Sequence, residues 1–187
     1  MSTSDNSEIA RKKKVKQLTI ELASGDDKKI SSALKGLQVH GDSSVITPIL
    51  NTWKTVTSQT VQKEIHEFLN DLKYTDSAEH IMNALKNDEF KSIRQHLLNV
   101  VWNCTVDYSE FLADFVAIAV EGDFMETLEC LTVIENLDGP FQEHQFLEAQ
   151  LALSDYAALE NREEQKAQLM SEIARIIQDL ERNHIEF

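Results

Sequence analysis

Residues 33–53, ALKGLQVHGDSSVITPILNTW, decide the fold of this chain. The stretch begins with apolar residues at helical spacing, among them Ala33 and Leu37. Gly41 then suits the end of a helix, and Asp42 suits the N-cap of the next one. The apolar residues that follow return at helical spacing. The stretch therefore predicts two short helices joined by a tight turn.

The same arrangement returns along the chain at a nearly fixed period. The first apolar residues of four predicted leading helices are spaced by 31, 32 and 32 residues: Ile30, Val61, Ile93 and Met125. The breaks between the leading and second helix of each pair are spaced by 34, 31 and 31 residues: Asp42, Asp76, Asp107 and Asp138. Helix pairs at such a period are typical of α-solenoids, in which each pair buries its apolar face against its neighbours.

These positions resemble a HEAT repeat. The likeness lies in the A-x-x-x-L spacing of Ala33 and Leu37, the Gly-Asp turn, and the I-x-P-I-L start of the second helix around Pro48. Later units keep only the period, so the resemblance covers residues 28–160. It implies an armadillo-like, right-handed α–α superhelix of about four helix pairs, with a curved surface that holds proteins. A tetratricopeptide array would need a Trp and a Gly-Tyr pair that are not in place.

The ends of such an array need capping helices. We predict a disordered segment at 1–7 and one helical-repeat domain over 8–187, with capping helices at 8–25 and 162–183. The final helix has a regular apolar stripe: Leu169, Ile173, Ile176 and Leu180. We expect this stripe to dock on the last repeat in a monomer. Its use over 162–182 as a seam for a homodimer is the alternative.

The apolar positions of the fourth pair are predicted to face the core. In the leading helix they are Met125, Leu128, Leu131 and Ile134. In the second helix they are Phe146, Leu147 and Leu151.

Charge is divided unevenly along the 187 residues, whose formal net charge is −14. Residues 1–60 hold nine basic and six acidic side chains, whereas residues 61–187 hold nine basic and 26 acidic ones. No Lys or Arg lies between Arg94 and Arg162, but 13 carboxylates do. Such a surface repels nucleic-acid phosphates and attracts a basic protein. The basic run at 11–16 is expected to be solvated or to contact the acidic half, with nucleic acid or anionic lipid as alternatives.

Five carboxylates form the candidate partner-binding site. Glu79, Glu110 and Glu143 fall at equivalent places in successive second helices, 31 and 33 residues apart. Asp114 and Glu121 share one side of a helix with Glu110. Stacked repeats would align these side chains for a basic segment. The alternative is that acidic residues in a first helical turn complement the helix macrodipole without any partner.

No pattern of residues indicates an active site. Two cysteines, Cys104 and Cys130, are too few for a disulfide scaffold or a zinc ribbon, and HExxH, phosphate-loop and nucleophile-elbow motifs are absent. No apolar run is long enough to span a membrane. We therefore expect no catalytic residue, no metal, no cofactor and no membrane association, in a cytoplasmic, reducing compartment.

Together these patterns predict a non-enzymatic protein-binding or scaffold module for a basic protein. The alternatives are a nucleic-acid-handling HEAT-like protein and an accessory regulator or lyase-type HEAT protein. A basic surface would favour the first of these alternatives, and a bound chromophore or ligand the second.

Overall fold

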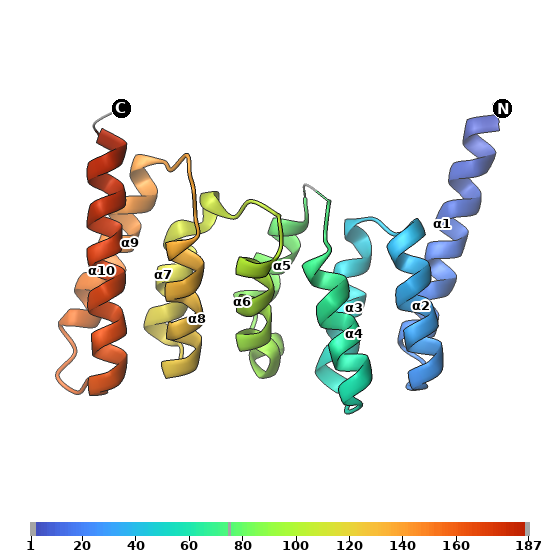
Figure 1. Cartoon of the computed structure of the whole chain (residues 1–187), viewed down its shortest axis with the longest axis horizontal. Coiled ribbons are helices and arrows are strands. Elements are labelled where there is room, and N and C mark those ends of the chain that lie inside the picture. The colour runs from blue at the N-terminus through green and yellow to red at the C-terminus, as the bar shows by residue number, and fades with distance from the viewer. Residues whose placement is uncertain (1–2, 75, 186–187) are drawn as a thin grey trace. The chain divides into compact units, whose positions relative to one another are not determined.

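In a computed structural model, residues 3–74 and 76–185 are described, and this part of the chain is helical without strands. Figure 1 shows its ten α-helices in chain order. They are α1 (Thr3–Leu22), α2 (Asp27–His40), α3 (Ile46–Thr55), α4 (Gln59–Asn70), α5 (Ser77–Leu85), α6 (Arg94–Asn103), α7 (Leu112–Glu121), α8 (Phe124–Glu135), α9 (Glu143–Ala157) and α10 (Glu164–Ile185). Short 3-10 turns precede α3, α6 and α7: η1 (Ser43–Val45), η2 (Asp88–Ile93) and η3 (Ser109–Phe111). The all-α prediction is confirmed at this level.

The helices form two compact units. Unit 1 comprises residues 1–93 and 104–106, and unit 2 comprises residues 94–103 and 107–187. In unit 1, α1 packs against α2 and α3, α2 against α4, and α3 against α5. In unit 2, α7 packs against α8 and α9, α8 against α6 and α10, and α9 against α10. The expected single domain over 8–187 stays a prediction.

The predicted helix boundaries have clear local causes. Gly25 adopts a φ of +69°, a left-handed conformation that favours glycine and ends α1. The carboxylate of Asp26 accepts a hydrogen bond from the Lys29 amide and caps α2. Asp123 and Glu126 form a reciprocal capping box that starts α8 only two residues after α7 ends.

Burial of apolar side chains between neighbouring helices provides the core of each unit. In unit 1 fully buried positions include Ile30, Leu37, Ile49, Leu50, Ile65, Leu69 and Ile81. In unit 2 they include Leu97, Leu98, Phe115, Val116, Val133, Phe146, Ile173 and Ile177. At about 25 cal/mol per Å² of apolar area, this burial is the main stabilising contribution of both units.

Several side chains predicted to face the core lie on the surface. Met125 is 42% exposed, Leu147 58% and Leu151 64%. Helix α8 instead buries Cys130 and Val133, beside Leu131 and Ile134. Helix α9 buries Gln145, Phe146, Ala149 and Tyr156. The predicted apolar face of α9 was wrong because α7 and α10 pack against its other side.

The two ends of the chain also differ from the prediction. Helix α1 begins at Thr3, so residues 3–7 of the segment expected to be disordered are helical, and residues 1–2 lie outside the described part. Glu8 helps to stabilise this first helix by hydrogen bonding Arg11 at 3.2 Å. In α10 the fully buried residues are Met170, Ile173 and Ile177. Leu169, Ile176 and Leu180 are half-buried, so the regular stripe is largely covered by the chain itself.

Arg11 links α1 to the turn that follows α2. Its guanidinium donates hydrogen bonds to the carbonyl oxygen of His40 at 2.9 Å and to the carboxylate of Asp42 at 3.1 Å. Hydrogen bonds from the Ser44 hydroxyl and amide, and then the Arg11 charge, lower the pKa of Asp42 below its usual 3.8. Ionised Asp42 therefore contributes stability above about pH 3.8, and this contribution is lost as the pH falls through the lower pKa of the folded state.

We predict that Asp42→Asn lowers the free energy of unfolding at pH 7 by a small amount, because the charge that pairs with Arg11 is removed. The difference from the wild type should shrink as the pH falls below the usual 3.8 and should vanish below the lower pKa of the folded state, where the wild-type carboxyl also becomes neutral. Urea unfolding of both proteins between pH 7 and pH 2 measures this difference. A difference that stays constant over the whole range would contradict the assignment.

Candidate functional site

The structure brings the N-terminal ends of η3 and α9 together in unit 2. The side-chain amide of Gln145 donates a hydrogen bond to the carbonyl oxygen of Ser109 at 2.9 Å. The amide of Gly139 donates to the Ser109 hydroxyl at 3.0 Å. Gln145 also caps its own helix by accepting a hydrogen bond from the Gln142 amide. Because these bonds are largely buried, they hold the two helix starts in a defined position.

Four of the five predicted site residues lie in η3, α7 and α9. Glu110 in η3 and Glu143 at the start of α9 are exposed, close to the contacts of Ser109 and Gln145. Asp114 is half-buried in the first turn of α7, and Glu121 is exposed at its last residue. Since α7 packs against α9, these carboxylates belong to one pair of neighbouring helices.

Glu79 lies apart from this group. It is exposed in the first turn of α5, which belongs to unit 1. Its predicted alignment with Glu110 and Glu143 therefore stays a prediction.

The helix macrodipole accounts for some of these carboxylates but not for all. Glu79, Glu110, Asp114 and Glu143 lie in first turns, where a negative charge is stabilising. Glu121 lies at the C-terminal end of α7, where the dipole disfavours a carboxylate. The macrodipole of α7 therefore does not explain the position of Glu121.

Most of the acidic side chains between Arg94 and Arg162 point into solvent. Ten of the 13 carboxylates are exposed and two are half-buried, while Glu126 is buried. Glu126 lies 3.9 Å from the guanidinium of Arg94, which is also buried.

Most of the other cations of unit 2 have partners within the chain. Arg175 pairs with Glu172 and Asp179 along α10, and Arg182 pairs with Asp179. Lys166 donates hydrogen bonds to the carbonyl oxygens of Val120 and Gly122 at the end of α7. Burial lowers the pKa of Lys166, although several carboxylates oppose this effect. The exposed carboxylates of α7 and α9 therefore keep a negative surplus.

Helix α9 exposes two leucines among its carboxylates. Leu147 and Leu151 are one helical turn apart and follow Glu143 at the same spacing of four residues, so the three share one side of the helix. Glu148 and Asp155 are exposed beside them. Sequence periodicity missed this surface because apolar residues at helical spacing are normally core residues.

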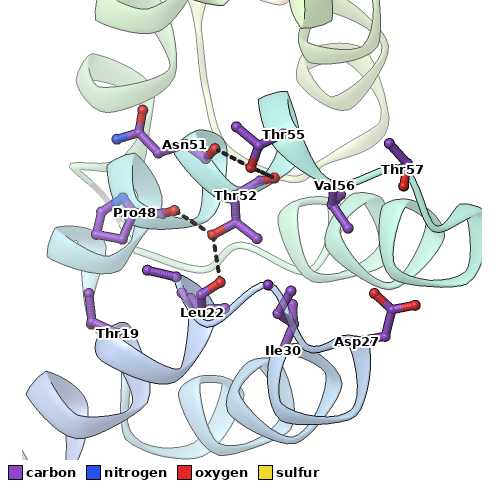
Figure 2. A pocket seen from close by; sticks show the side chains of 12 residues that line it. Thr19, Leu22, Asp27, Ile30, Pro48, Asn51, Thr52, Thr55, Val56 and Thr57 are labelled. Carbon is purple, nitrogen blue, oxygen red and sulfur yellow. Dashed lines mark hydrogen bonds between the residues drawn. The ribbon is translucent and has the colours of Figure 1, made fainter.

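A cavity of about 520 Å³ in unit 1 lies between α1, α2 and α3 and is rich in threonine (Figure 2). Its Thr52 hydroxyl lies within hydrogen-bonding distance of the carbonyl oxygens of Pro48 at 3.1 Å and Leu22 at 3.3 Å. The Thr55 hydroxyl likewise contacts the carbonyl oxygen of Thr52 at 3.1 Å. These hydroxyls connect helix ends, and Asp27 is the charged side chain among the lining residues. The cavity therefore pairs no nucleophile with a base.

The two cysteines differ in burial. Cys130 is fully buried, and this burial, with the nearby Glu126 carboxylate, raises the pKa of its thiol far above the usual value. Cys104 is half-buried and forms no disulfide. Within residues 3–74 and 76–185, no cluster of three or more His, Cys, Asp or Glu side chains could hold a metal ion.

Comparison with known proteins found no match to a family model, a curated protein or a solved structure. In the part of the chain that the structure describes, every helix is too short or too polar to cross a membrane.

We predict that Gln145→Leu lowers the free energy of unfolding by about 1–3 kcal/mol, because the carbonyl of Ser109 loses a buried donor. The same change removes the acceptor of the Gln142 amide. Urea unfolding monitored by circular dichroism measures the loss. His144→Leu is the matched control, since His144 is exposed on the same helical turn. Equal stability of the two variants would contradict the role of Gln145.

Proposed function

We propose that this chain is a non-enzymatic protein-binding module that holds a basic segment of another protein on α7 and α9. We call this surface the acidic face and define it by Glu110, Asp114, Glu121, Glu143, Glu148 and Asp155. The observation that carries the proposal is that five of these six carboxylates are exposed and Asp114 is half-buried, on the neighbouring helices α7 and α9 and the turn η3, in a stretch that contains no Lys or Arg. An ordinary solvated surface mixes both charges.

Complementary charge explains how such a face would select its partner. A cluster of one sign speeds the encounter with an oppositely charged surface and disfavours like-charged partners. The same cluster repels phosphate backbones, so the proposal favours a basic protein over a nucleic acid. Exposed leucines on α9 supply apolar area that a purely ionic contact would lack.

The helical arrangement supports a HEAT-like scaffold. In each unit a helix packs against the next helix but one, as helices do in stacked pairs: α1 on α3, α2 on α4 and α3 on α5 in unit 1, and α6 on α8, α7 on α9 and α8 on α10 in unit 2. The starts of α2, α4, α6 and α8 are spaced by 32, 35 and 30 residues, which is close to the predicted period of 31–34 residues. We further propose a cytoplasmic scaffold, because Cys104 and Cys130 form no disulfide in the part of the chain that the structure describes.

We predict that Glu110→Lys with Glu143→Lys weakens binding of a basic peptide tenfold or more, because two attractive charges become repulsive. The probe is a synthetic amphipathic helix of leucine and lysine, and fluorescence anisotropy at low salt gives the affinity. Raising the salt to about 0.5 M should weaken the wild-type complex, since exposed charges are screened over a few ångströms at that concentration.

The matched control is Asp71→Lys with Glu89→Lys, two exposed carboxylates of unit 1 that undergo the same change of charge. It should bind the peptide within about twofold of the wild type. Equal weakening by both double variants would show that only net charge matters and would contradict a specific acidic face. Glu79→Lys, measured in parallel, shows whether Glu79 belongs to the binding surface.

A further inference from the structure

Helix α1 carries an exposed stripe in which isoleucines and lysines share one side. Ile9, Lys13, Lys16 and Ile20 follow one another at spacings of four, three and four residues. Ile9 is 61% exposed and Ile20 66%, and both lysines are exposed. We call these four residues the basic stripe.

Within residues 3–74 and 76–185 the lysines of the basic stripe form no ion pair, and its isoleucines are exposed. Leu18 and Leu22, on the opposite side of α1, are buried in unit 1. Lys12 lies 3.7 Å from Glu8, but Lys13 and Lys16 make no ion pair with any side chain that the structure describes. The stripe is therefore a solvent-facing surface with two uncovered apolar side chains.

The acidic face has the complementary composition. Leu147 and Leu151 are about as exposed as the two isoleucines, and they lie among Glu143, Glu148 and Asp155. Each surface thus combines two large apolar side chains with charges of a single sign. Exposed apolar side chains rimmed by charge are typical of surfaces that another protein covers.

We propose that the basic stripe of one copy docks on the acidic face of a second copy, so that α1 of one chain packs along α9 of the next. Ile9 and Ile20 lie about 16 Å apart along α1, whereas Leu147 and Leu151 lie about 6 Å apart along α9. One isoleucine would therefore cover the two leucines, and Lys13 and Lys16 would reach the surrounding carboxylates. This inference rests on the proposed function in one respect, because it uses the same acidic face as the binding surface.

Charge decides the geometry of this association. Two acidic faces, or two basic stripes, would bring like charges together, which disfavours a symmetric contact of either kind. A contact between unlike surfaces is heterologous, so copies can associate in growing chains or in closed rings. A single helix-on-helix contact buries little area, so the association is weak and depends on concentration.

Sedimentation velocity of the full chain tests the proposal at low salt, from about 5 µM to about 500 µM, the range expected for a small interface. The wild type should sediment faster as its concentration rises. Lys13→Glu with Lys16→Glu removes the positive charge of the basic stripe. Leu147→Ser with Leu151→Ser removes the apolar side chains of the acidic face. Each double variant alone should associate at least tenfold more weakly than the wild type.

Sedimentation of an equimolar mixture of the two double variants is the decisive measurement. The lysine variant retains its acidic face, and the leucine variant retains its basic stripe. The mixture should therefore form a 1:1 dimer and nothing larger. Lys28→Glu with Lys35→Glu, exposed lysines of α2, and Val39→Ser, an exposed apolar residue of α2, are controls that should associate like the wild type.

Three outcomes would overturn the inference: a wild type that stays monomeric throughout, double variants that associate like the wild type, or a mixture that stays monomeric. Binding of the leucine–lysine peptide to the lysine variant separates this inference from the proposed function. A monomeric wild type whose lysine variant still binds the peptide would refute self-association alone. Self-association without peptide binding would refute the general binding role alone.

Discussion

The burial of each helix's apolar side against its neighbours is the interaction on which the rest of this structure depends. Helices of 9–22 residues are marginal in isolation, so their stability comes from packing. Each unit meets this constraint by packing successive helices, which buries side chains such as Leu37, Ile65 and Phe115 completely. The outer sides of the helices can then carry charged side chains.

The polar contacts at the helix starts refine this packing. Ser43 hydrogen bonds Asp76 in unit 1, and Ser109 accepts from Gly139 in unit 2, so neighbouring helix starts are joined in both units. In unit 2 the buried amide of Gln145 adds a second link. These contacts fix which outer sides of α7 and α9 lie next to each other. The acidic face therefore depends on buried hydrogen bonds as well as on its own carboxylates.

Much of the fold could be predicted from the sequence because caps and apolar spacing are local signals. Asp26, Gly25 and Asp42 mark helix ends in the sequence and do so in the structure. Which side of a helix faces the core depends on the helices that pack against it. For this reason the sequence-based prediction wrongly placed Leu147 and Leu151 in the core. Their exposure depends on where α7 and α10 pack. Of the acidic face, the sequence-based prediction named Glu110, Asp114, Glu121 and Glu143 but missed Glu148, Asp155 and these leucines.

Amide chemical-shift mapping tests the central claim, that α7 and α9 form a protein-binding surface, most directly. The protein would be labelled with ¹⁵N and titrated with the amphipathic leucine–lysine helix at low salt. The account predicts shifts concentrated in residues 110–121 and 143–155, with their largest values near Leu147 and Leu151. Shifts confined to α2–α5, or none at saturating peptide, would contradict it.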